Sequence, residues 1–337
     1  MTYLQTNYLG LTLKNPIVPS SSPLTRDLDQ SRRLEDAGAA AIVMHSLFEE
    51  QIRSEDEHYS RFLMEQSIGH AEADSFHPAH VDFTSSLDEH LEQLQALKQA
   101  LDIPVIASLN GVSPQGWISH GKDLEQAGAD ALELNVYYIP SGHEESAEQV
   151  EQRYIDLLQD LRKQVQLPIT MKLSSQFSSP VNMVKKLEQS GADGVSLFNR
   201  FYQPDIDLDT LQFRHTLALS DSQESLLRIR WIGILRGHTK LSLAATGGFR
   251  QSDDILKALL VGADITHLCS ELLEHGAQRI TTILKDIEHW MQTREYESLQ
   301  QLKGSMCKQC AIDPGVYEHA NYFHMLNSHQ SSSGVRR

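Results

Sequence analysis

A short Gly-Ala turn recurs four times in this chain, and each copy leads into a run of apolar residues. The runs are AAIVMHS after Gly38-Ala39, ALELNV after Gly128-Ala129, GVSLFN after Gly191-Ala192 and ITHLCS after Gly262-Ala263. A small turn that repeatedly delivers the chain from a helical pattern into a buried run is typical of repeated helix-strand units. The repeat therefore favours a fold in which helices and strands alternate.

Four further apolar runs lie before and between these copies, at residues 15–22, 103–111, 167–175 and 240–248, which makes eight in all. They are continuous rather than alternating, as buried parallel strands covered by helices are. Eight such strands predict an α/β fold of the (β/α)8 TIM-barrel type. Functional groups of these barrels gather where the strands end, so we expect the chemistry at the C-terminal ends of the runs.

The segments around the eight runs supply the remaining elements. Residues 3–14 predict a β-hairpin that closes the barrel floor. Helices are expected at 28–37, 87–101, 114–127, 144–165, 228–237 and 272–294, and a small β excursion at 205–219 lies inside an insertion at 201–227. Residues 47–86 are polar, rich in histidine and weakly periodic, which favours a loop that acts as a lid.

Length and composition favour one domain with an appendage. Because single-domain barrels of this kind commonly reach ~250 residues or more, the 337 residues are divided into a barrel at 1–294 and a helical extension at 295–337 with a disordered, Ser-rich end.

A net charge of −16 argues against a nucleic-acid partner. No run approaches the ~18 apolar residues of a membrane span, and the N-terminus does not resemble a signal peptide. With only three cysteines, the chain is expected to be cytoplasmic.

Lys172 ends the fifth apolar run, in PITMKLSS. A lysine that points from an apolar strand into a barrel mouth needs an anionic or hydrogen-bonding partner. It could be a solvated charge at the rim, a Schiff-base nucleophile, or a cation that stabilises negative charge on a bound cofactor. Which of these three roles Lys172 has depends on the residues that surround it in the folded protein.

Gly247-Gly248 and Cys269-Ser270 follow the seventh and eighth runs, where barrels of this type place a phosphate. We therefore predict phosphate binding there, with a plain turn as the alternative. Asn110 and Asn135 each end a run and offer amides suited to the edge of a heterocycle, although either could be a turn residue.

The ordered set NPIVPSS, SLNG, ELNV, PITMKL, FN and ATGG, each at the end of a run, resembles the dihydroorotate dehydrogenase family of FMN-dependent barrels. The resemblance covers roughly residues 5–290 and implies an FMN-dependent oxidoreductase that acts on a CH–CH bond of a small, pyrimidine-related substrate. It also implies a substrate contact at Asn199. The FMN contacts that it implies are Ser20, Ser21, Ser46, Asn110, Asn135, Lys172, Gly247, Gly248, Cys269 and Ser270.

The chain departs from the family at the acid-base group. Family members carry a cysteine or serine base in a pattern like N-V-S-C-P-N, whereas this chain reads Asn135-Val136-Tyr137-Tyr138-Ile139-Pro140. His45 stands where the closest class has a lysine, and a Gly-Gly-Leu-Ser-Gly loop is absent. We therefore predict Lys172, Tyr138 and His45 as catalytic residues, with Ser141 and His143 as further candidates, and expect FMN binding to survive better than dihydroorotate turnover.

Cys307 and Cys310 form a C-x2-C motif, and His319 and His324 follow within eighteen residues. Because the gap between Cys310 and His319 is shorter than in zinc fingers, we predict no metal site. Two other functions stay open for the whole chain: a phosphate-binding aldolase or isomerase that uses Lys172 as its nucleophile, and a flavin-binding barrel without catalysis. The expected partners are a small-molecule substrate and an unidentified electron partner, and a homodimer is compatible with the sequence.

Overall fold

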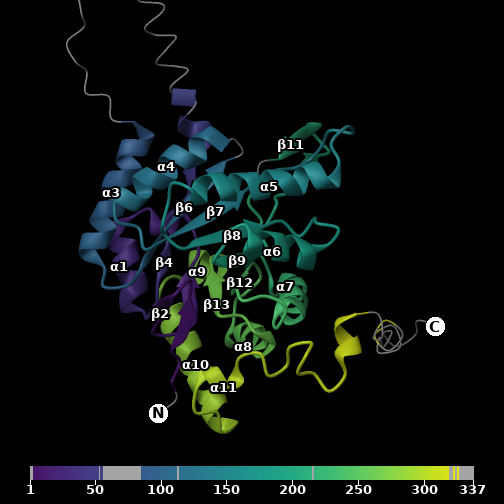
Figure 1. Cartoon of the computed structure of the whole chain (residues 1–337). Helices are drawn as coiled ribbons and strands as arrows, with labels where there is room; N and C mark the ends of the chain where they lie inside the picture. The colour runs from purple at the N-terminus through teal and green to yellow at the C-terminus, as the bar shows by residue number, and fades with distance from the viewer. Residues whose placement is uncertain are drawn as a thin grey trace, which may run out of the picture.

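The structure, a computed structural model, describes residues 3–52, 54–55, 85–111, 114–214, 216–318, 322 and 325. Eight parallel strands form its centre: β3 (Ile17–Pro19), β4 (Ile42–Val43), β6 (Val105–Gly111), β7 (Ala131–Val136), β8 (Ile169–Leu173), β9 (Gly194–Leu197), β12 (Ser242–Thr246) and β13 (Ile265–Leu268). Their order is β3-β13-β12-β9-β8-β7-β6-β4. The two end strands meet, because the Ala40 N–H donates to the Ile17 carbonyl at 3.0 Å. This arrangement confirms the predicted (β/α)8 barrel (Figure 1).

Helices surround the barrel: α1 (Leu28–Asp36), α3 (Ser86–Ala100), α4 (Pro114–Gln126), α5 (Ala147–Arg162), α6 (Pro180–Gln189), α7 (Ser222–Leu235), α8 (Ser252–Val261) and α10 (Arg279–Thr293) (Figure 1). Helix α7 begins earlier than predicted, because the Asp221 carboxylate caps it by accepting the N–H groups of Gln223 and Glu224. The single helix predicted at 272–294 is wrong. Gly276, with φ 75° and ψ 178°, separates α9 (Ser270–His275) from α10.

The four Gly-Ala turns have the same backbone conformation. Gly38, Gly128, Gly191 and Gly262 all have positive φ angles, between 96° and 118°. A side chain on a residue in that region meets its own backbone, so glycine is strongly preferred there. The recurrence of glycine at these points follows from one geometric requirement that is repeated at four helix-to-strand connections.

The N-terminal hairpin closes the floor of the barrel, as predicted. Strand β1 (Thr6–Tyr8) pairs antiparallel with β2 (Leu11–Leu13). Tyr8 is fully buried, and its hydroxyl donates to Thr170 Oγ1 at 3.3 Å inside the barrel. Gly194 leaves room for the floor, because a Cβ atom at that position would lie 2.7 Å from Leu9 Cδ2. The strand ends on the opposite side are therefore the open face.

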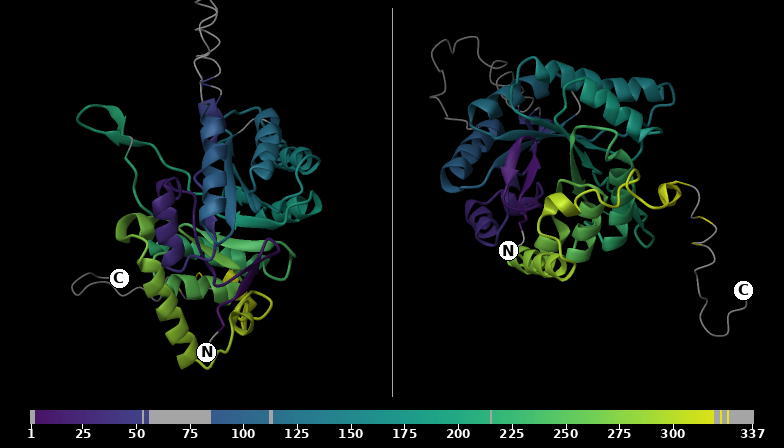
Figure 2. Two further views of the ribbon diagram at one scale, coloured as in Figure 1. Left: turned by 90° about the vertical axis from the view of Figure 1, so that its left-hand side faces the viewer. Right: turned by 60° about the horizontal axis from the view of Figure 1, so that its bottom comes forward.

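The insertion after β9 contains the expected β excursion. Strands β10 (Asp205–Asp207) and β11 (Gln212–Arg214) form an antiparallel hairpin that projects away from the barrel (Figure 2, left). Ile206 and Phe213 are cross-strand partners and are 53% and 65% exposed. Because α7 already begins at Ser222, the insertion is shorter than the predicted 201–227, and we use the term below for residues 201–221. The hairpin formed by β10 and β11 is called its arm.

The remaining described segments are short. Strand β5 (Leu47–Phe48) pairs with β6, whereas residues 56–84 of the predicted lid lie outside the described residues. Helix α11 (Leu299–Leu302) leads into a tail that packs on α7 and α8, where the N–H groups of Gly304 and Lys308 donate to the carbonyls of Leu259 and Gly233. The Ser-rich end also lies outside the described part. Among the described helices, none has the length and apolar character that a membrane crossing requires.

Candidate active site

A cavity of about 760 Å³ lies at the C-terminal ends of the barrel strands. Its volume falls within the ~300–1,000 Å³ that is usual for small-molecule sites. Two predicted site residues, Tyr138 and Gly248, are not among the residues that line it. The predicted residues that do line it are Ser20, Ser21, His45, Ser46, Asn110, Asn135, Lys172, Asn199, Gly247, Cys269 and Ser270.

Lys172 has a buried anionic partner that the sequence analysis missed. Its ammonium nitrogen lies 3.3 Å from Glu133 Oε1, and Ser196 Oγ donates to Glu133 Oε2 at 3.2 Å. Glu133 is 1% exposed. Burial opposes its ionisation, but the Lys172 ammonium, His267 and the hydrogen bonds outweigh this effect and lower the pKa of the Glu133 carboxyl below its usual range. Lys172 therefore stands in the cavity as one half of a buried ion pair.

The amides and hydroxyls of neighbouring strands are connected by hydrogen bonds. Asn135 and Lys172 are register partners of β7 and β8. Asn199 Nδ2 donates to Asn135 Oδ1 at 2.5 Å, and Ser46 Oγ lies 3.1 Å from Ser21 Oγ. Strand register thus brings together residues that are far apart in the sequence.

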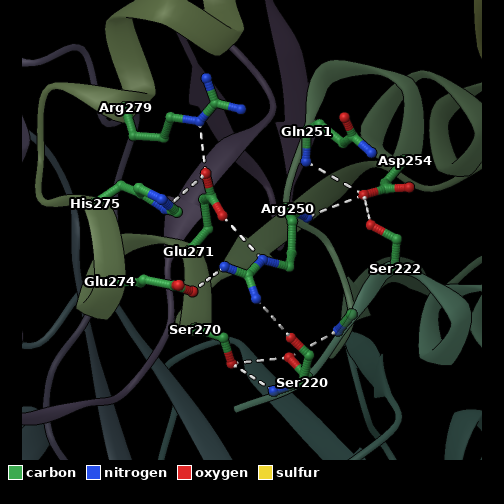
Figure 3. Close-up of polar contacts among 11 residues, drawn as sticks. Ser220, Ser222, Arg250, Gln251, Asp254, Ser270, Glu271, Glu274, His275 and Arg279 are labelled. Carbon is green, nitrogen blue, oxygen red and sulfur yellow. Dashed lines mark hydrogen bonds and ion pairs between the residues drawn. The ribbon is translucent and has the colours of Figure 1, made fainter.

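The predicted phosphate region contains a further residue, Ser220, which comes from the insertion (Figure 3). Its hydroxyl accepts the Gly248 N–H at 3.2 Å and lies 2.8 Å from Ser270 Oγ. Arg250 donates to the Ser220 carbonyl at 3.4 Å and is itself ion-paired with Glu271 at 3.0 Å. This cluster gathers a backbone N–H and two hydroxyls at one end of the cavity.

The two glycines of this turn have φ angles of 91° and 86°. A Cβ atom on Gly248 would lie 2.5 Å from Ser225 N, and one on Gly247 would lie 2.8 Å from a guanidinium nitrogen of Arg228. The turn therefore requires glycine both for its backbone angles and for the close approach of α7.

His45 and His90 form a buried pair beside the cavity. Their rings meet edge to face with centroids 4.7 Å apart, and Nδ1 of His45 and Nε2 of His90 have no hydrogen-bond partner among the described residues. Burial and the nearby Arg26 lower the pKa of His45 to about 4, and burial lowers the pKa of His90 to about 3. Both imidazoles are therefore neutral at pH 7.

The side chains of Tyr137 and Tyr138, the two residues that follow β7, lie in different places. Tyr138 turns away from the cavity: its hydroxyl donates to Glu145 at 2.5 Å, and the guanidinium of Arg153 lies 4.7 Å from its ring centroid. The hydrogen bond to Glu145 raises the pKa of Tyr138. Tyr137 lines the cavity instead. Successive side chains of a strand point to opposite faces, and this alternation could have identified Tyr137 from the sequence.

The three cysteines occupy different environments. Cys269 lines the cavity, and burial raises the pKa of its thiol. Cys307 is buried and Cys310 exposed, whereas His319 and His324 lie outside the described residues. Within the described residues, no group of three or more metal-ligating side chains occurs.

Comparison with known proteins gives a consistent result. Residues 80–291 match the sequence profile of a family described as dihydroorotate dehydrogenase. Dihydroorotate dehydrogenase A (fumarate) of Lactobacillus delbrueckii subsp. bulgaricus is 26% identical over 270 residues, which cover 78% of this chain and 86% of the relative. The catalytic subunit of dihydroorotate dehydrogenase B (NAD(+)) of Shouchella clausii is 25% identical over 328 residues, which cover 90% of this chain and 98% of that relative. NAD-dependent dihydropyrimidine dehydrogenase subunit PreA of Escherichia coli is 21% identical over 327 residues, which cover 89% of this chain and 76% of that relative.

Proposed function

The chain belongs to the dihydroorotate dehydrogenase family, and from that premise we propose that it is an FMN-dependent oxidoreductase acting on a CH–CH bond of a small, pyrimidine-related molecule. One observation carries the proposal: Lys172, ion-paired with buried Glu133, faces a cavity that nine of the ten predicted cofactor contacts line. The names of the relatives, which are dehydrogenases of dihydroorotate and dihydropyrimidine, support the class of reaction.

The residues present fit FMN at both of its ends. The hydroxyls of Ser220 and Ser270 line the cavity and offer donors to a phosphate, and the Gly248 N–H fixes Ser220 by donating to its hydroxyl oxygen. The amides of Asn110 and Asn135 and the ammonium of Lys172 line the same cavity and suit the polar edge of a flavin ring. The cavity therefore combines an anion site with a polar wall for a flat heterocycle.

FMN would supply the transfer of two electrons as a hydride. The chain would hold it through the donors above, with the Lys172 ammonium stabilising negative charge on the ring. Asn199, fixed by its hydrogen bond to Asn135, would hold a polar group of the substrate. Among the described lining residues, Arg26, Arg200 and Lys172 are cationic and Glu50 is anionic. Lys172 and Arg200 are ion-paired with Glu133 and Glu224, so Arg26 is the cation best placed to attract a negatively charged group.

The two alternative functions receive less support. An aldolase or isomerase would need Lys172 as a free amine, but its nitrogen is engaged by Glu133. A barrel that binds flavin without catalysis is consistent with the missing cysteine or serine base. Reduction of the bound flavin followed by reoxidation with an unsaturated compound distinguishes this second alternative from an enzyme.

The experiment is a titration of FMN-free protein with FMN. A bound flavin spectrum that bleaches on reduction and returns when orotate, uracil or another activated alkene is added supports the proposal. Absence of binding, or binding without any reoxidation by an alkene, refutes it. Trapping of a carbonyl compound on Lys172 by borohydride would favour the aldolase instead.

The proposed partners are a small-molecule substrate and an electron partner of unidentified type, and we place the protein in the cytoplasm. The homodimer stays a prediction. The exposed apolar side chains of the arm, which include Ile206 and Phe213, are the surface that such a contact would cover. Sedimentation of the protein with and without residues 205–214 would test it.

A further inference from the structure

The proposed reaction needs a group that gives a proton to carbon, and the predicted groups do not provide it. Tyr138 is held by Glu145 outside the cavity. Ser141 and His143 are exposed and do not line the cavity. His45 lines it, but as a neutral imidazole at pH 7, since its pKa is about 4. The proposed reaction therefore requires another proton donor among the residues that line the cavity.

We propose that Tyr137 is the catalytic proton donor and that the insertion holds its hydroxyl in place. This inference rests on the proposed function, because it assigns the acid of that same reaction. It names a residue that stands directly before the position at which family members carry their base.

The geometry of Tyr137 fits this role. Its side chain lines the cavity, on the same side of the chain as Asn135, two residues earlier. Its hydroxyl oxygen accepts the backbone N–H of Tyr202 at 3.2 Å, and its ring packs against Phe201 with centroids 4.2 Å apart. This hydrogen bond uses a lone pair of the Tyr137 oxygen and not its proton, so the O–H group can donate to a molecule in the cavity.

The accepted hydrogen bond also assists the chemistry. As the proton leaves, negative charge grows on the tyrosine oxygen, and the Tyr202 N–H already points at that oxygen. A donor fixed in this way stabilises the developing charge without having to reorient. Phe201 and Tyr202 belong to the insertion, so the insertion positions the Tyr137 hydroxyl. The same insertion supplies Ser220 to the phosphate cluster.

The step balances as the reduction of a polarised C=C bond. The π bond would break as the electron-poor carbon gains a hydride, which bound FMN in its reduced form would supply, and the Tyr137 O–H would give its proton to the adjacent carbon. The electron pair of the O–H bond stays on oxygen, and water then reprotonates the phenolate. The oxidant is the alkene and the reductant is the flavin. A hydroxyl group that donates a hydrogen bond can also give its proton to carbon, so the group suits alkene reduction.

The adjacent tyrosine provides a matched control. Tyr137→Phe and Tyr138→Phe remove the same atom from neighbouring residues, and only the first lines the cavity. Both variants and the unaltered protein are loaded with FMN, reduced without oxygen, and mixed either with an alkene (orotate, uracil or 2-cyclohexenone) or with ferricyanide. Ferricyanide takes electrons without transferring a proton to carbon.

We expect Tyr137→Phe to slow reoxidation by the alkene about 10²-fold or more, the usual contribution of a positioned acid, and to leave reoxidation by ferricyanide unchanged. Tyr138→Phe should change neither rate. If Tyr137→Phe reoxidises with the alkene as fast as the unaltered protein, the inference is wrong and the proposed function stands. If the unaltered protein binds no FMN or reacts with no alkene, the proposed function itself fails.

A second measurement needs no cofactor. Because the Tyr137 hydroxyl accepts the Tyr202 N–H, its removal should speed hydrogen exchange of the Tyr202 amide in flavin-free protein. A net hydrogen bond of about 0.5–1.5 kcal/mol corresponds to roughly 2–13-fold faster exchange. Unchanged exchange in Tyr137→Phe would contradict the geometry, and faster exchange in Tyr138→Phe would show that the insertion responds to either tyrosine.

Discussion

Replacement of Lys172 by methionine should destabilise the flavin-free protein by about 3–5 kcal/mol, because it leaves the Glu133 carboxylate buried without its cation. Glu133 is 1% exposed and would keep the hydrogen bond from Ser196 at 3.2 Å and the His267 ring, whose Nε2 lies 3.7 Å from Glu133 Oε2. Conversion of both partners, in Lys172→Met with Glu133→Gln, removes the unpaired charge. The double variant should therefore recover most of the lost free energy of unfolding.

The assay is urea unfolding of flavin-free protein. A matched control is Lys186→Met, whose ammonium pairs with Glu151 at 2.8 Å but is 37% exposed, so its loss should cost less than about 1 kcal/mol. The cost of Lys172→Met should be largest at neutral pH and shrink as the pH falls through the carboxyl range. The folded-state pKa of Glu133 is lowered, so its stabilisation exists above the unfolded pKa and disappears as the carboxyl protonates. Equal costs for the two lysines would refute the buried charge pair.

Three further predictions concern acid stability, the glycine turn and the phosphate cluster. Burial lowers the pKa of His90 to about 3, so below pH 6.5 the unfolded chain binds more protons than the folded one, and the unfolding free energy falls as the pH falls. His90→Phe should make the decrease in unfolding free energy between pH 7.5 and 5 smaller by about 2 kcal/mol. A decrease of the same size in the variant and the unaltered protein would contradict this. Gly248→Ala places a Cβ atom 2.5 Å from Ser225 N at φ 86° and should cost about 1–3 kcal/mol in urea unfolding, so an unchanged unfolding free energy would refute the tight turn. Ser220→Ala should weaken FMN binding by about 10-fold or more in fluorescence titrations, whereas Ser222→Ala, whose hydroxyl donates to Asp254, should leave it unchanged; equal affinities would remove Ser220 from the phosphate cluster.

The barrel was predictable because its signals are local. Each Gly-Ala turn marks a positive-φ connection into a buried strand, and four such turns with eight apolar runs leave few alternatives. The errors arose where one residue breaks a periodic pattern. Gly276 lies within a helical pattern that continues on both sides of it, and Asp221 caps α7 inside a segment that was assigned to the insertion.

The residues that line the cavity were predictable at the strand ends but not beyond them. Glu133 is a single charged residue in an apolar strand. Its register partner in β8 is Thr170, and its contact with Lys172, two residues further along β8, is visible only in the structure. Ser220 comes from a segment without a motif, and the fold of the insertion brings it to Gly248. Tyr138 was chosen by its position in a family pattern, whereas the alternation of side chains along the chain places Tyr137 on the side that faces the cavity.

The central claim is that this barrel binds FMN through Lys172 and the phosphate cluster. The most direct test compares the flavin affinity of the unaltered protein with that of one double variant. We predict that the unaltered protein binds one FMN per chain with quenched flavin fluorescence. The double variant of Lys172→Met and Glu133→Gln, which keeps the fold by the reasoning above, should bind it much more weakly. FMN affinity that is the same in both proteins, or the absence of flavin binding in the unaltered one, would contradict the account.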